Sequence, residues 1–265
     1  MGRLTIFAKG NLDVRDTLHS LRLGGKLAWN GVGEVVRERF PGWSVRLRHE
    51  TFTRSDALLE AGGSAPAELA HRALPLGAYP LASQFSTTIF ETDADAYVLS
   101  SQPDLNTGLV RRRPSGYLLY PEGRSGWSAA DRQWLSEKFL GAPALDVSAS
   151  MDNLARIIER IRSRSVAPIL IYNISAVVPG ERVHVYEGLE ETLSTRIRRL
   201  NLALVELSQR TGVSIIDVDR IVALGGADRL KLDALHLTAE ACRLVAEGVV
   251  RVLEELGCLP SEGRR

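Results

Sequence analysis

An aspartate and a histidine three residues apart, Asp233 and His236, are the pair of residues best suited to chemistry in this sequence. They lie directly before an apolar segment with helical spacing, which places them in a loop. This spacing lets a carboxylate orient an imidazole and stabilise its charged form. The pair therefore predicts an acid–base site with His236 as the general base. Taken alone, the same spacing favours a helix-start aspartate beside a solvated histidine, and the surrounding sequence decides between the two interpretations.

Two further loops carry polar side chains where a predicted strand ends. They read K-G-N-L-D at residues 9–13 and S-S-Q-P-D at residues 100–104. In open α/β sheets, ligands bind beyond the carboxyl ends of the strands. We therefore expect both loops to share a cleft with the loop of His236. The candidate substrate-binding residues of this cleft are Lys9, Gly10, Ser101, Gln102 and Asn106.

Strands and helices alternate along the chain and must position these loops. Short apolar runs predict strands, and apolar residues at helical spacing predict helices. The alternation predicts an α/β fold in which helices cover both faces of a mostly parallel sheet. The predicted strands are 4–8, 44–49, 96–100, 168–174 and 213–218, and the predicted helices are 27–39, 54–61, 129–139, 150–163, 189–211 and 237–256.

From residue 168 onward, the order and spacing of these features resemble the SGNH/GDSL hydrolase superfamily. An apolar strand is followed by a helix containing Asn201, a strand ending at Asp217, and D-x-x-H opening an Ala-rich helix. Residues 5–13 take the place of the family's nucleophile block, and the resemblance covers the chain except 62–80 and 105–150. It implies a three-layer α/β/α sandwich with flavodoxin-like strand order, and hydrolysis of ester bonds.

The chain departs from that family at three of its four name-giving residues. Leu12 stands where the family keeps its nucleophilic serine, and leucine cannot attack an acyl group. No glycine occurs in residues 50–54, where the family places a glycine that binds the oxyanion. Pro103 replaces the family's asparagine, and proline offers neither an N–H nor a side-chain donor. Only the histidine, with its aspartate partner, is retained.

Two interpretations of the function follow from this pattern. In the first, the protein is a hydrolase or acyltransferase acting on an ester, and Asp13 or a bound water replaces the serine. Asn11 or Gln102 would then donate to the developing oxyanion. The catalytic candidates are His236, Asp233, Asp13 and Asn11. In the second, the fold is kept without catalysis and binds a small polar ligand or a protein partner. The intact Asp233–His236 pair favours the first.

Composition argues against several other classes of protein. The formal net charge is +1, so no bulk field favours nucleic acid or an anionic membrane surface. No apolar run approaches the length of a membrane span, and the N-terminus does not resemble a signal peptide. Neither metal-ligand spacing nor a glycine-rich nucleotide motif is present. We expect a cytoplasmic single domain over 1–265 that binds a small-molecule substrate without metal or cofactor.

An insertion at about 105–150 interrupts the resemblance. It carries the aromatic residues Tyr117, Tyr120, Trp127 and Trp134, which predict a small satellite core or a homodimer contact. It also carries three consecutive arginines at 111–113. Such a run forms either a solvated loop or a grip on a substrate phosphate or carboxylate.

Overall fold

The computed structural model describes residues 2–177 and 191–260. The chain forms two compact units, each built from more than one segment of the chain. The sequence analysis expected one domain with an insertion at 105–150, and that insertion lies inside the second unit. The first unit is Met1–Glu50, Asp93–Gln102 and Ser165–Arg265, and the second is Thr51–Thr92 and Pro103–Arg164.

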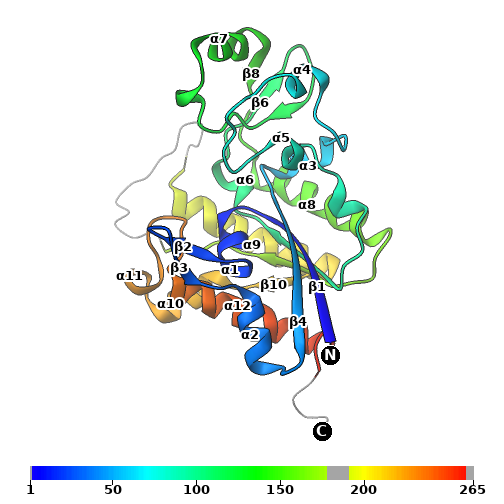
Figure 1. The fold of residues 1–265 in the computed structure, drawn as a ribbon, viewed down its shortest axis with the longest axis vertical. Helices are drawn as coiled ribbons and strands as arrows, with labels where there is room; N and C mark the ends of the chain where they lie inside the picture. The colour runs from blue at the N-terminus through cyan, green and yellow to red at the C-terminus, as the bar shows by residue number, and fades with distance from the viewer. Residues whose placement is uncertain (1, 178–190, 261–265) are drawn as a thin grey trace. The chain divides into compact units, whose positions relative to one another are not determined.

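A five-stranded sheet forms the centre of the first unit (Figure 1), with strand order β10-β9-β5-β1-β4. The pairs β1–β5, β5–β9 and β9–β10 are all parallel. In chain order the arrangement is 2-1-3-4-5, which is the flavodoxin-like order that the resemblance implied. The strands are β1 (Gly2–Gly10), β4 (Trp43–Thr51), β5 (Ala96–Ser100), β9 (Ile169–Tyr172) and β10 (Ser214–Ile216).

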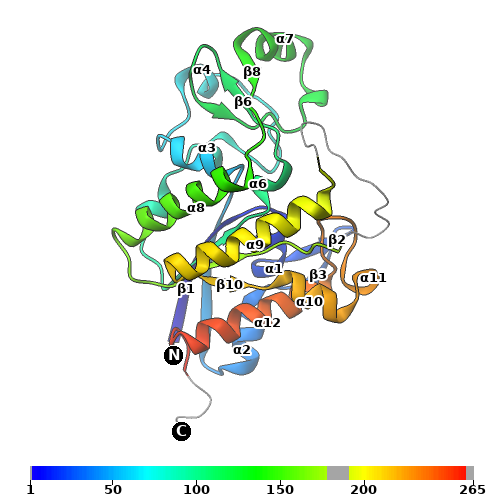
Figure 2. The same cartoon turned by 180° about the vertical axis from the view of Figure 1, so that it is seen from behind.

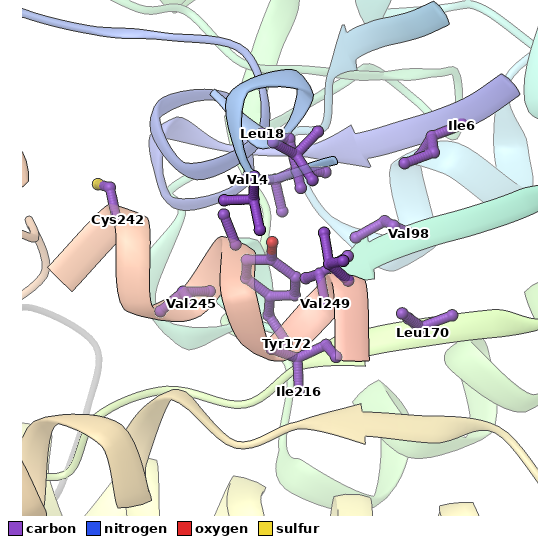
Figure 3. Packing of buried hydrophobic residues seen from close by; sticks show 14 of the residues in the cluster. Ile6, Val14, Leu18, Val98, Leu170, Tyr172, Ile216, Cys242, Val245 and Val249 are labelled. Atoms are coloured by element: carbon purple, nitrogen blue, oxygen red, sulfur yellow. The ribbon is translucent and has the colours of Figure 1, made fainter. Parts of the chain in front are cut away.

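Helices cover this sheet, and their apolar faces form the core. α1 (Leu12–Leu18), α2 (Val32–Arg39) and α12 (Ala239–Glu255) share one buried cluster with the strands, where Val245 and Val249 of α12 pack near Leu170 and Tyr172 of β9 (Figure 3). α9 (Leu193–Thr211) lies along the sheet as seen from behind (Figure 2) and buries a separate leucine-rich stripe. The remaining elements of this unit are β2 (Leu21–Leu23), β3 (Lys26–Trp29), α10 (Val218–Gly225) and α11 (Ala227–Leu230).

The predicted helix over 27–39 was wrong in its first part. Lys26–Trp29 is instead β3, which pairs with β2 in an antiparallel hairpin. Trp29 is buried there and donates from Nε1 to the backbone oxygen of Thr17 at 2.9 Å. Gly31 then adopts a φ of 83°, so α2 begins only after it. The apolar residues of this segment repeat at helical spacing, but the buried contact of Trp29 stabilises a strand there instead.

Capping aspartates shift two further boundaries. The helix expected from Ser150 begins earlier, at Val147, because the side chain of Asp146 accepts from the backbone N–H of Ala149. The last strand ends at Ile216 rather than residue 218, because Asp217 caps α10 by accepting from the N–H of Arg220. The sequence analysis overlooked α10 and its cap.

The second unit has a smaller core of its own. Trp127, Leu135 and Phe139 lie in it, and Tyr117 and Trp134 pack against it, so three of the insertion's four named aromatic residues belong to a satellite core. Tyr120 packs against a separate small cluster. Arg111 and Arg112 form ion pairs with Glu60 and Glu68. The elements of this unit are α3 (Ser55–Glu60), α4 (Ala67–Ala70), α5 (Leu81–Gln84), η1 (Thr88–Phe90), α6 (Pro103–Asn106), β6 (Val110–Arg112), β7 (Leu118–Leu119), η2 (Arg124–Gly126), α7 (Ala129–Lys138), β8 (Phe139–Gly141) and α8 (Val147–Arg162).

Candidate active site

The loop before α12 holds Asp233 and His236 as a hydrogen-bonded pair. Nδ1 of His236 lies 2.7 Å from Oδ2 of Asp233, while Oδ1 of Asp233 accepts from the backbone N–H groups of Leu235 and His236, each at 2.8 Å. Partial burial raises the pKa of Asp233, but these backbone and ring hydrogen bonds outweigh it and hold the pKa below its ordinary value. Asp233 is therefore ionised at neutral pH and fixes the ring, whose side chain is 43% exposed.

Lys231 holds this loop from inside. Its side chain is buried, and Nζ donates to the backbone oxygens of Ala234 at 2.7 Å and Val177 at 2.6 Å. The backbone of Lys231 also forms an isolated antiparallel bridge with Leu237, and the N–H of Leu232 donates to the oxygen of His236 at 2.9 Å. Backbone contacts thus join the two ends of the loop, and the ammonium group of Lys231 holds its middle at Ala234. The sequence analysis missed Lys231.

The first loop follows β1 and turns sharply into α1. A Cβ on Gly10 would lie 2.4 Å from Cγ2 of Val14, so only glycine fits where the strand meets the helix. Asn11 is the N-cap residue of α1, although its side chain does not cap the helix. Asp13 lies in the first turn of α1, where a carboxylate is favourable near the helix N-terminus.

Asp13 has one bonded and one unbonded carboxyl oxygen. Oγ of Ser100 donates to Oδ2 of Asp13 at 2.5 Å and itself accepts from the N–H of Gln102 at 2.9 Å. Within the described ranges 2–177 and 191–260, Oδ1 of Asp13 is buried and has no hydrogen-bond partner. Burial raises the pKa of Asp13 to about 6, against the opposing hydrogen bond from Ser100. A buried carboxyl oxygen without a hydrogen-bond partner lowers the stability of the folded state, and few such atoms occur in native proteins.

A small cavity joins the early and late loops. It has about 20 Å³ of space, and its walls come from the segments that follow β1, β5, β9 and α11. That is room for about one ordered water. Nε2 of Gln102 also donates to the backbone oxygen of Leu235 at 3.5 Å, which links the loop after β5 to the His236 loop. The lining residues are Asp13, Gln102, Tyr172, Asn173, Ile174, Ser175, Val218, Lys231, Ala234, Leu235 and Leu237.

The cavity gathers some of the predicted site residues and leaves out others. Asp13 and Gln102 line it, whereas His236 is flanked by two lining residues and does not line it itself. Asn11 does not line it, nor does Leu12 block it. Asn106 belongs to the second unit and is exposed.

Lys9 and Ser101 are buried, and both have partners within the fold. Lys9 is buried, and Nζ forms an ion pair with Oε2 of Glu50 at 3.1 Å. Burial lowers the pKa of Lys9, and the contact with Glu50 opposes that change. Oγ of Ser101 donates to the backbone oxygen of Tyr172 at 3.0 Å. Lys9 is therefore not a solvent-exposed residue at the end of the strand.

Asn173, directly after β9, is a further polar residue of the site that the sequence analysis did not single out. Its Nδ2 donates to Oδ1 of Asp217 at 2.8 Å, and its Oδ1 accepts from the N–H of Asp219 at 3.1 Å. Oδ1 of Asp219 accepts in turn from the N–H of Ala176 at 2.7 Å. An asparagine at the carboxyl end of a buried strand was the available signal.

Neither a metal cluster nor a membrane span is found in the part of the chain that the structure describes. No group of three or more His, Cys, Asp or Glu side chains there is arranged to hold a metal ion. None of the helices there combines the length and the apolar character needed to cross a membrane. His184 lies outside the described residues and is therefore not among these side chains.

Solved structures with the same architecture carry esterase and hydrolase names. A candidate SGNH hydrolase from Slackia heliotrinireducens superposes with a TM-score of 0.52 at 13% identity, covering 95% of this chain and 100% of that one. An acetylxylan esterase from Geobacillus stearothermophilus gives 0.52 at 10% identity, covering 94% of each chain. A lipase/acylhydrolase from Enterococcus faecalis gives 0.50 at 12% identity over 100% of both chains.

These likenesses show the fold, which is that of the SGNH hydrolases. No family model matches the sequence. No curated protein matches it either. The fold assignment therefore rests on structural similarity alone, and a fold does not determine the reaction. The chemistry must be inferred from the residues of the site.

Proposed function

We propose that this protein hydrolyses an ester or related acyl substrate, with His236 as the general base oriented by Asp233. The observation that carries the proposal is the 2.7 Å contact between Nδ1 of His236 and Oδ2 of Asp233 on a half-exposed loop. In the proposal, that contact holds the ring so that its other nitrogen, Nε2, is available to the reacting group. The SGNH-like fold supports the same class of reaction.

A water molecule is the nucleophile in this proposal. Leu12 offers no nucleophilic atom, and Ser100 is buried with its hydroxyl bonded to Asp13 and absent from the cavity lining. The cavity beside Asp13 has room for about one water, and Oδ1 of Asp13 is the acceptor that would hold it. The water thus takes the place of the serine hydroxyl as the source of the attacking oxygen, and Asp13 positions that water.

The reaction then needs one proton transfer in each direction. Because His236 flanks the cavity without lining it, its loop must first move to bring Nε2 to the water. As the water oxygen then attacks the acyl carbon, Nε2 takes the proton of the water, and the imidazolium returns that proton to the departing alcohol. The side chain of Gln102 lines the cavity and is the candidate donor to the oxyanion, since its 3.5 Å hydrogen bond to Leu235 is long and easily exchanged. An alcohol in place of water would make the same steps an acyl transfer.

Chromogenic acyl esters of increasing chain length test the proposal. His236→Ala should lower kcat/KM about 100- to 10,000-fold, the range for losing a general base. His19→Ala is the matched control, because His19 is exposed and contacts Ser20 outside the cavity lining. Equal turnover by the wild type and His236→Ala would remove the base role.

Binding without catalysis is the second candidate, and the size of the cavity favours it. About 20 Å³ does not accommodate an acyl substrate without movement of the surrounding loops. This candidate predicts no turnover of esters, acetylated sugars or thioesters by the wild-type protein. Its ligand would bind with the same affinity to the wild type and to His236→Ala, as measured by calorimetry.

A further inference from the structure

The second unit has a surface groove of its own. It lies between the short turn η2, the helix α7 and the strand β8. Its volume is about 430 Å³, within the usual range of small-molecule sites. β8 is an edge strand of the small sheet, whose order is β7-β6-β8, so one side of the groove has no neighbouring strand.

The floor of this groove is apolar. Leu135 and Phe139 are buried members of the unit's core, and both reach the groove. Leu140 of β8 also lines it and is 52% exposed, so it adds accessible apolar surface next to the two buried residues. Val110 on the neighbouring strand β6 completes the apolar surface. A hydrocarbon chain laid here would cover surface that is now in water.

The rim of the groove is cationic and is not neutralised. Arg124 and Arg132 both line it, whereas no Asp or Glu does. Nη1 of Arg132 donates to the backbone oxygens of Ser125 and Trp127, which fixes the guanidinium without cancelling its charge. Among the described residues, neither arginine has a carboxylate partner, in contrast to Arg72, which is paired with Asp131.

We propose that this groove binds a medium-chain fatty acid as its carboxylate. The acyl chain lies over Leu135, Phe139 and Leu140, and the carboxylate meets the guanidinium groups of Arg124 and Arg132. Guanidinium forks match the planar carboxylate and its single charge. The site is independent of the proposed ester hydrolysis, because every residue that forms it belongs to the second unit.

Titration calorimetry of the full chain with decanoate and decanol separates charge from apolar contact. Decanoate should bind at least about tenfold more tightly than decanol, because only the carboxylate meets the arginines. Octanoate should bind about tenfold more weakly than decanoate, because it buries two fewer methylene groups. Equal affinity for decanoate and decanol would overturn the proposal, as would tighter binding of decyl phosphate than of decanoate.

Charge-reversing variants locate the site. Arg124→Glu should weaken decanoate binding at least about tenfold, because it replaces an attraction by a repulsion. Lys138→Glu is the matched control, since Lys138 is exposed on the same helix as Leu135 and lies outside the groove lining. Its affinity should stay within about twofold of the wild type. Equal losses in the two variants would mean a non-specific charge effect and would reject the site.

Discussion

At the scale of single residues, Asp13 differs in three ways from an ordinary surface carboxylate. One of its oxygens is bonded to Ser100, the other is buried without a partner in the described chain, and the group lines the cavity beside the His236 loop. Burial raises the pKa of Asp13 to about 6. A group with these properties lowers the stability of the fold at neutral pH, which is typical of residues retained for function.

Asp13→Asn should therefore be more stable than the wild type at pH 7.5. The folded state binds the Asp13 proton more tightly than the unfolded state, so wild-type stability falls as pH rises from about 4 to about 6. The variant lacks this loss and should gain about 1–3 kcal/mol at pH 7.5 and nothing at pH 4. Urea unfolding at both pH values measures it, with the exposed Asp228→Asn as the control that shows no such dependence.

The same Asp13→Asn protein should hydrolyse esters at least about tenfold more slowly than the wild type, because an amide holds the attacking water less strongly than a carboxylate. Steady-state kinetics on the ester that the wild type turns over fastest would measure this. Full activity in the variant would leave Asp13 with a structural role only.

At the scale of elements, the loop between α11 and α12 is the part that sets the geometry of the site. Asp233 fixes the ring of His236, but the backbone that carries both residues is braced by the ammonium group of Lys231. Lys231 is 6% exposed, and its ammonium group also donates to Val177 in the segment after β9. Lys231 is thus a positioning residue that acts through the loop.

Lys231→Met should lower kcat about tenfold or more with little change in KM, because the loop loses its inner support while its exposed face is unaltered. Lys231→Arg should recover part of the loss, since a guanidinium can still donate to the backbone oxygens. Nitrogen NMR of the His236 ring reports the contact with Asp233 directly. An unchanged ring signal in Lys231→Met would contradict the positioning role.

Some elements could be predicted from the sequence and others could not. The strand 96–100 is correct to the residue, because every side chain in it is buried and apolar runs of that length indicate parallel strands. The position of Asp13 beyond a strand-ending glycine could likewise be expected. Lys231 could not, because its role depends on the carbonyl groups of Val177 and Ala234, which no local pattern places beside it.

At the scale of the whole molecule, stability depends on the core between the sheet and α12. Leu170 is fully buried in this cluster (Figure 3), so its truncation leaves a cavity that the neighbouring side chains cannot fill. Leu170→Ala should cost about 2–5 kcal/mol of unfolding free energy. Leu202→Ala on α9 is the matched control, since Leu202 is 69% exposed, and its cost should stay below about 0.5 kcal/mol.

The path of the chain through the two units limits how the protein can be divided. Along the sequence, the two segments of the second unit come before and after β5, which is the middle strand of the five-stranded sheet. Any continuous piece that contains the whole second unit therefore carries away that strand and its fully buried side chains. Such a fragment would expose an apolar strand that invites aggregation, and the remainder would have a sheet broken at its centre. Separate expression of the units needs rejoined segments rather than truncation.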